Sequence, residues 1–444
     1  MTEDNSLENQ MSRVRKDKWL ILAHCFNMDG RAASHTITDR IPCLMKEGIL
    51  PVVLSAPTGV KDTRFPHLRI ISPAPSGILF EMRQIIKKIF PGAAAEKGFK
   101  AVLTILCLPF YILEKIFIHL DSQWSWFISA AARGFFIVRK HRPVLIYSTA
   151  GPPSTHIAGY LLNWFLKVPW LAELHDPLVF DTDSTGSQRY EFKRFVERVI
   201  FKHADGVIYF TNKALKSAEK RNGPRKNLNM LRPGAPQEDF SEIIYRKRKM
   251  IHFGHFGVLG DGRDLTAVIR ALHEIIRDDR SLEDRIVLDI YGTTLDSVSS
   301  GALKKCPLGN ILKEHGRLEF DPETGKTGRR RVIETMRQCD VLLVIHGTDI
   351  ICEEYIPSKV YEYLLTQRPV FGLGLPGSEL EDLLIEKGHE FSDISDHDNI
   401  KKCIRGFIDR WQEKGLADMP VNTPVTVEEY VKRLFVIADS ITGR

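Results

Sequence analysis

In the first half of the chain, short apolar runs alternate with longer amphipathic stretches. Short apolar runs, which are typical of buried strands, occur at 19–26, 50–55, 144–148, 170–174 and 206–210. Between them lie stretches with apolar residues on one helical face, at 35–46, 155–166 and 191–203. Connections of this length join neighbouring parallel strands through a helix, so we expect a parallel β-sheet built from βαβ units.

A break in this pattern at 232–236, where two prolines and a glycine end a strand, marks the expected boundary between two domains. The alternation then resumes, with strands expected at 250–256, 286–291, 341–345 and 370–373 and helices at 265–277, 331–338 and 359–366. We therefore expect an α/β protein with two doubly wound domains, at 18–236 and 250–420. The C-terminal segment 425–444 has an amphipathic pattern, which predicts a last helix that packs back toward the first domain.

Residues 78–139 depart from the alternation and have the pattern of helices throughout. Their apolar stretch 101–113 is interrupted by Pro109 and is too short to span a bilayer. A helical pair lying at a membrane surface would suit this composition, because the stretch is preceded by basic residues: Lys87, Lys88, Lys97 and Lys100. A helical insertion packed on the first domain explains the same residues, so both interpretations stay open.

Composition narrows the class of protein. The chain has 444 residues, of which 43% are hydrophobic and 27% charged, a balance typical of globular proteins. Its net charge of +6 is spread along the sequence, so we expect no nucleic-acid partner. The seven cysteines have no paired spacing and the first residues lack the pattern of a secretory signal peptide. We therefore expect a cytoplasmic protein without disulfides or a zinc site.

The candidate chemistry is concentrated between the strands expected at 341–345 and 370–373. Pro357 and Ser358 predict the start of a helix there, followed at once by the cation Lys359. In open α/β sheets such helix starts lie at the carboxyl ends of the strands, where phosphates bind. Glu354 and Glu362 stand on either side of this start, and a carboxylate can accept hydrogen bonds from the hydroxyls of a ribose. Taken alone, their spacing is more typical of two solvated surface residues than of a binding site.

A glycine-rich loop follows the first strand of the second domain, as a phosphate-binding loop would. Its glycines Gly254, Gly257 and Gly260 recur every third residue and differ from the Gly-x-Gly-x-x-Gly pattern of dinucleotide-binding proteins. An oxidoreductase therefore has little support. The glycines could also serve only to form turns.

The whole segment 353–364 resembles the Glu-x7-Glu motif of glycosyltransferase family 4, in the bacterial form with Pro-Ser-Lys between the glutamates. Several stretches of the first half look like those of transferases for cell-surface polysaccharides, namely 148–156, Pro169-Trp170, 174–177, Asp121 and Trp124. This resemblance implies a GT-B fold, in which two Rossmann-like domains face a cleft, with the helical insertion in the first. It places the nucleotide on the second domain and the acceptor mainly on the first.

The resemblance also implies roles for individual residues. Glu362 would hold the ribose, Glu354 would lie beside the transferred sugar, and Ser358 with Lys359 would contact the diphosphate. In the glycine-rich loop, Gly257 would approach the donor and Arg263 would neutralise its phosphates.

The first domain would add contacts to the donor sugar. Gly30 lies in the loop after the opening strand, where the family places a glycine close to the sugar phosphates. His175 and Asp176 end a strand that faces the cleft. One feature departs from the family, because Val258 occupies the position where members usually have an arginine on the leaving phosphates.

The resulting prediction is a hexosyltransferase-like enzyme that uses a nucleoside diphosphate sugar and retains the anomeric configuration. Its acceptor would be a glycan or a lipid-linked glycan in surface polysaccharide biosynthesis, with possible peripheral contact to the inner face of the cell membrane. No cofactor or metal ion is expected. Two alternatives stay open, a sugar-nucleotide epimerase with the same fold and a non-catalytic scaffold.

Overall fold

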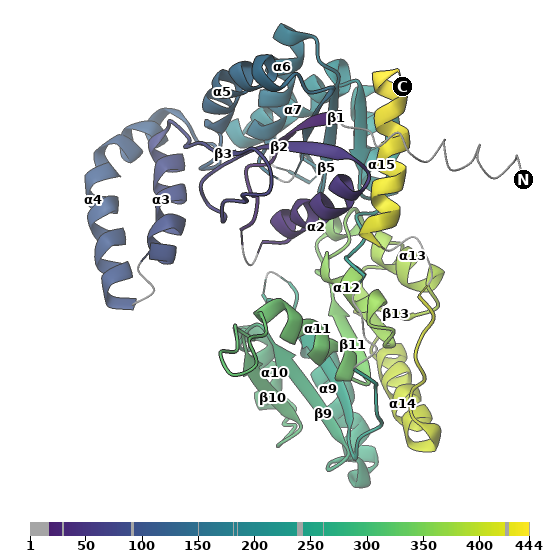
Figure 1. The fold of residues 1–444 in the computed structure, drawn as a ribbon. Helices are drawn as coiled ribbons and strands as arrows, with labels where there is room; N and C mark the ends of the chain where they lie inside the picture. The colour runs from purple at the N-terminus through teal and green to yellow at the C-terminus, as the bar shows by residue number, and fades with distance from the viewer. Residues whose placement is uncertain are drawn as a thin grey trace, which may run out of the picture. The chain divides into compact units, whose positions relative to one another are not determined.

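The structure is a computed structural model that describes residues 17–28, 31–89, 93–149, 151–180, 182–183, 185–237, 243–260, 262–421 and 426–443 (Figure 1). It divides into two compact units. Unit 1 comprises Met1–Pro233 with Val427–Arg444, and unit 2 comprises Gly234–Thr426.

Unit 1 is built on a seven-stranded sheet in the order β3-β2-β1-β4-β5-β6-β7, in which every neighbouring pair is parallel. The strands are β1 (Asp17–Leu22), β2 (Ile49–Ser55), β3 (His67–Arg69), β4 (Leu145–Ser148), β5 (Trp170–Leu174), β6 (Gly206–Tyr209) and β7 (Leu228–Met230). The order reverses between β1 and β4. In sheets of this kind, ligands bind beyond the carboxyl ends of the strands at such a reversal.

Helices cover both faces of this sheet. They are α2 (Ala32–Lys46), α5 (Trp126–His141), α6 (Pro153–Leu166), α7 (Gln188–His203), α8 (Asn212–Asn222) and α15 (Val427–Thr442). The C-terminal helix α15 belongs to the core of unit 1, because its Tyr430 and Leu434 are buried in one cluster with Ile37 of α2 and Ile21 of β1. In Figure 1 it runs beside α2.

The expected helical insertion 78–139 has two parts in the structure. Helices α3 (Pro75–Ile89) and α4 (Ala93–Phe117) form a hairpin, whereas α5 is a crossover helix that packs against α6 and buries Trp126 and Ile137 in the core. Pro109, which interrupts the apolar stretch 101–113, lies inside α4, and the helix continues through this residue. A proline inside a helix removes one backbone hydrogen bond, but the helix can continue beyond it.

Unit 2 has a six-stranded, fully parallel sheet in the order β10-β9-β8-β11-β12-β13. Its strands are β8 (Ile251–Phe256), β9 (Ile286–Tyr291), β10 (Leu312–Gly316), β11 (Val341–Ile345), β12 (Val370–Gly374) and β13 (Glu390–Asp393). Its helices are α9 (Thr266–Asp278), α10 (Ser297–Lys305), α11 (Gly328–Gln338), α12 (Lys359–Leu365), α13 (Glu379–Glu386) and α14 (His397–Lys414), with 3-10 turns η1 (Arg280–Leu282) and η2 (Ile350–Glu353). The order of this sheet reverses between β8 and β11.

The predicted α/β class with two doubly wound sheets is confirmed. The expected strand 19–26 is too long, since β1 ends at Leu22 and the buried residues that follow it form a loop. The strand expected to end at the break 232–236 corresponds to β7, whereas the sequence pattern missed three short strands, β3, β10 and β13. All three lie at a sheet edge, where β10, for example, is largely exposed and lacks an apolar run.

Candidate functional site

The loop that follows β8 makes a tight turn at the carboxyl end of the sheet. Gly257, Gly260 and Gly262 have positive φ angles of 115°, 114° and 76°, which favour glycine. The backbone N–H of Gly260 donates to the carbonyl of Arg263 at 2.9 Å, and the N–H of Arg263 donates back at 3.0 Å. These three glycines are therefore required by the turn that positions Arg263.

Lys359, the first residue of α12, reaches back to this loop. Its ammonium Nζ donates to the carbonyl oxygen of Phe256 at 2.7 Å. A Cβ atom built on Gly257 would lie 3.5 Å from the same Nζ. The hydroxyl of Tyr363, one turn later in α12, accepts from the backbone N–H of Phe256 at 3.0 Å. The start of α12 is thus bound to the end of β8, and the lysine ammonium lies against the glycine loop.

This place is electropositive although its groups are partly removed from water. Burial, followed by the charge of Arg263, lowers the pKa of Lys359 to about 7. Burial lowers the pKa of His346, just after β11, to about 4. Burial and the nearby Lys359 hold the pKa of His255 in β8 well below its usual range. Both imidazoles are therefore neutral near pH 7, and the two cations are left to attract an anion.

The other residues predicted in this segment lie on either side of the start of α12. Glu354 caps the end of η2, where its N–H donates to the carbonyl of Ile351 at 3.2 Å. Ser358 is at the N-cap position of α12 and is exposed, and its side chain makes no capping hydrogen bond. Glu362 lies in the first turn of α12 and is partly exposed.

Glu362 has a partner that the sequence did not indicate. Its Oε1 atom lies 3.0 Å from Nη2 of Arg329, the second residue of α11. The sequence pattern placed the start of this helix at residue 331, whereas α11 begins at Gly328 and Thr327 caps it by accepting from the N–H of Arg330. A threonine before a basic run could have indicated the earlier start.

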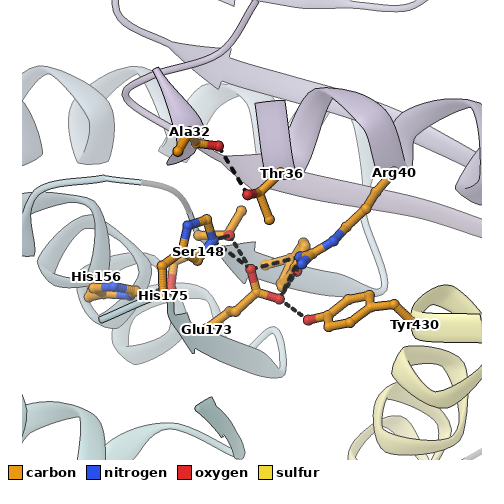
Figure 2. A network of polar contacts seen from close by, with 10 residues as sticks. Ala32, Thr36, Arg40, Ser148, His156, Glu173, His175 and Tyr430 are labelled. Atoms are coloured by element: carbon orange, nitrogen blue, oxygen red, sulfur yellow. Dashed lines mark hydrogen bonds and ion pairs between the residues drawn. The ribbon is translucent and has the colours of Figure 1, made fainter. Parts of the chain in front are cut away.

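In unit 1, His175 follows β5 and is held by a buried carboxylate. Glu173 is fully buried, and Figure 2 shows Arg40, His175 and Tyr430 directed toward it. Its Oε1 accepts from His175 Nε2 at 2.9 Å and from the hydroxyl of Thr149 at 2.5 Å. The imidazole of His175 also stacks on Phe210, with ring centres 4.5 Å apart. The position of His175 is therefore fixed from two sides.

The charge of Glu173 also determines which tautomer of His175 is present. Burial alone would raise the pKa of Glu173, but Arg40 and the hydrogen bonds from His175 and Thr149 hold it well below its usual range. An ionised carboxylate only accepts hydrogen bonds, so Nε2 of His175 carries a proton. Nδ1 is therefore the ring nitrogen of His175 that does not face Glu173 and that can contact a hydroxyl group of a ligand.

The structure brings Gly257, Arg263 and Lys359 together in unit 2, with Ser358 next to them in the chain. It places His175 in unit 1 with Asp176, an exposed residue, directly after it. Gly30 lies outside the described residues. Sequence reasoning missed the network around Glu173, although a glutamate inside the apolar strand 170–174 is itself a signal, because a buried charge requires a partner.

Residues 117–234 match the family model of the glycosyl transferase 4-like domain. This part of unit 1 is therefore similar in sequence to glycosyl transferase 4-like domains. The match extends from the end of α4 to the end of unit 1's first segment and includes Glu173 and His175, whereas their partners Arg40 and Tyr430 lie outside it. The resemblance to family 4 glycosyltransferases that the motifs predicted is thereby confirmed. None of the curated proteins compared with the chain matches it in sequence.

Solved structures extend the likeness from this glycosyl transferase 4-like domain to both units. Anabaena HepE in complex with UDP-glucose has a TM-score of 0.56 at 14% identity, over 96% of this chain and 98% of HepE. Sucrose-phosphate synthase from Thermosynechococcus elongatus has a TM-score of 0.56 at 13% identity, over 97% and 98%. A candidate UDP-N-acetylglucosamine 2-epimerase from Listeria monocytogenes has a TM-score of 0.52 at 11% identity, over 96% of both chains. The predicted GT-B fold is confirmed, and this fold is common to transferases and the epimerase.

Proposed function

We propose that the chain is a glycosyltransferase that moves a sugar from a nucleoside diphosphate sugar to a glycan or lipid-linked acceptor. The observation that carries this proposal is the cationic cluster at the carboxyl ends of β8 and β11. There the ammonium of Lys359 lies against the glycine loop at 2.7 Å from the carbonyl of Phe256, close to Arg263. A lysine whose pKa is lowered in this way gains most from an anion such as a diphosphate.

In the proposed complex, Arg263 and Lys359 neutralise the diphosphate of the donor, and Gly257 lets the backbone approach it. Glu362 accepts hydrogen bonds from the ribose hydroxyls with the carboxylate that Arg329 orients. This pair of cations compensates for Val258 at the position of the usual arginine. The proposal therefore includes no metal ion and no cofactor.

The reaction step breaks the bond between C1 of the sugar and the diphosphate oxygen, and forms a bond from C1 to the acceptor oxygen on the same face. The acceptor's proton passes to the departing diphosphate, and the anomeric configuration is retained. Arg263 and Lys359 stabilise the charge that develops on the leaving group, while Glu354 faces the positive charge that develops on the sugar.

Unit 1 contributes to recognition of the sugar and of the acceptor. Nδ1 of His175 accepts from a sugar hydroxyl, since Nε2 is occupied by Glu173. Asp176, exposed beside it, and Gly30 complete the contacts to the donor in this proposal. Acceptors of surface polysaccharide biosynthesis at the cytoplasmic face of a membrane are the class that we propose.

The proposal is tested with a panel of UDP-sugars, GDP-sugars and other sugar nucleotides, by measuring release of the nucleoside diphosphate from each. We expect one donor to be cleaved, with the anomeric configuration of the product read by nuclear magnetic resonance. Glu354→Gln should lower the rate at least about 100-fold, because it removes a charge at the reacting carbon, whereas the neighbouring Glu353→Gln should not. If no member of the panel bound or reacted, the enzymatic function would be refuted in favour of a scaffold.

A further inference from the structure

Helix α4 exposes an outer face that consists of apolar residues. Large apolar side chains that are at least 43% exposed occur along its length, namely Phe99, Val102, Ile105, Leu106, Leu108, Phe110, Ile112, Leu113, Ile116 and Phe117. At 100° per residue they occupy an arc of about 200° that contains no polar side chain between Phe99 and Phe117. We call this surface the α4 outer arc.

The polar residues of α4 face the other way, toward α3. Lys100 pairs with Glu96, and the hydroxyl of Thr104 accepts from Nη2 of Arg83 in α3 at 3.0 Å. The amphipathic pattern of α4 is therefore inverted relative to a helix on a water-soluble core, since Glu114 is buried, Lys100 and Glu96 are partly buried as a pair, and the apolar side is exposed.

Specific contacts hold the base of the hairpin to unit 1. The carboxylate of Glu114 accepts from the backbone N–H of Ser76 at 2.7 Å and from the indole N–H of Trp124 at 2.9 Å. The carboxylate of Glu81 in α3 accepts from the N–H of Ser72 at 3.0 Å. These contacts fix α3 and α4 to the edge of the domain, while Figure 1 shows the hairpin standing away from the sheet. The outer arc therefore remains exposed and does not pack against the sheet of unit 1.

An uncovered arc of this size is costly in water. Burying one large aliphatic or aromatic side chain is worth about 1.5–3 kcal/mol, and the arc has ten of them. Apolar patches of such extent on a soluble domain mark a surface that is covered in use. The exposed charges of the hairpin indicate what covers it.

The exposed charges of the hairpin are basic. Arg83 and Lys87 are exposed on α3 and Lys97 is exposed on α4, whereas the acidic residues of the hairpin are buried or paired. Protein interfaces mix polar groups into their apolar area, but the outer arc has none. Basic residues bordering a purely apolar face fit a bilayer with anionic headgroups. No helix among the residues that the structure describes is long and apolar enough to cross a membrane.

We propose that α4 lies in the surface of an anionic bilayer, with its outer arc among the acyl chains and Arg83, Lys87 and Lys97 at the headgroups. Helix α3 then forms the second layer, away from the lipid core. The hairpin thereby attaches unit 1, the unit to which we assign the acceptor, to the surface that carries lipid-linked molecules. Lipid binding by α4 is independent of donor binding in unit 2.

Flotation of the full-length chain with phosphatidylcholine vesicles, with and without phosphatidylglycerol, tests this proposal. We expect binding that increases with phosphatidylglycerol and weakens with salt. The double variant I105D/L106D should lose at least about tenfold in vesicle partitioning, because two charges enter the apolar arc. The matched control Ile385→Asp alters an equally exposed isoleucine on α13 and should bind like the native chain. Lys97→Gln should weaken binding to anionic vesicles about fivefold.

Two results would overturn the proposal. One is the absence of vesicle binding, or binding that I105D/L106D leaves unchanged. The other is a native dimer, measured by light scattering, that becomes a monomer in I105D/L106D without any vesicle binding, which would assign the arc to a second copy. Titration of each variant with UDP shows whether unit 2 remains functional, so failure of the membrane proposal and failure of the donor proposal are distinguished.

Discussion

The lowered pKa of Lys359 makes donor binding depend on pH in a defined direction. In the free protein, burial and Arg263 bring the pKa of this ammonium to about 7. A bound diphosphate raises that pKa again, because it places negative charge next to the ammonium. Binding therefore takes up a proton. The affinity is highest below pH 7 and declines as the pH rises through 7.

The size of the effect follows from the fraction of Lys359 that is already protonated. This fraction is about 0.9 at pH 6 and about 0.1 at pH 8 for a pKa of about 7. If only the protonated form binds well, the affinity falls about tenfold between these pH values, and about 0.9 proton is taken up at pH 8. His255 and His346 do not contribute, since burial keeps both imidazoles neutral across this range.

Calorimetric titration with an intact sugar nucleotide, UDP-glucose if the chain binds UDP, in buffers of different ionisation enthalpy measures both quantities. UDP-glucose is preferable to UDP because its diphosphate keeps a constant charge from pH 6 to pH 8. The variant Lys359→Met should bind more weakly and show no dependence on pH. The control Lys401→Met removes a surface lysine paired with Glu274 and Asp278 and should keep the native profile. A flat profile in the native chain, or the native slope in Lys359→Met, would refute the assignment of the proton to Lys359.

Three further predictions concern single contacts. Arg329→Met should weaken UDP binding about tenfold in a fluorescence or calorimetric titration by freeing the carboxylate of Glu362, while Arg329→Lys should restore part of the loss. Gly257→Ala should weaken UDP-glucose binding by a similar factor in the same assay, since its φ of 115° strains any other residue. Arg40→Met should lower the free energy of unfolding of unit 1 in urea by about 3–5 kcal/mol, because it leaves the buried carboxylate of Glu173 without its cation. Unchanged affinity or stability in a variant would contradict the role that we assign to the residue it replaces.

The central strands and longer helices of both sheets were predictable because their apolar residues are consecutive or recur at helical spacing. The end of β1 was not, since Ala23, Cys25 and Phe26 are buried in a loop and look like a continuing strand. Edge strands such as β10 were missed because exposure allows polar residues there.

The residues of the candidate site were also predictable only in part. The local motif at 353–364 and the loop at 254–263 indicated Lys359, Arg263 and Glu362 directly. Their partners come from distant parts of the chain: Arg329 pairs with Glu362 across 33 positions, and Arg40 pairs with Glu173 across 133 positions. Such pairs depend on which helices cover which strands, and no single sequence window contains both members. The inverted face of α4 also became visible only when the packing of the hairpin was known.

Binding of a nucleoside diphosphate by unit 2 is the claim on which the account depends. Calorimetric titration of the native chain with UDP and with GDP, repeated with Glu362→Ala, measures it most directly. We expect saturable heat with one of the two nucleotides, and a loss of affinity of at least about tenfold in Glu362→Ala, since the ribose then lacks its acceptor. Saturable heat with neither nucleotide, or full affinity in Glu362→Ala, would contradict the account.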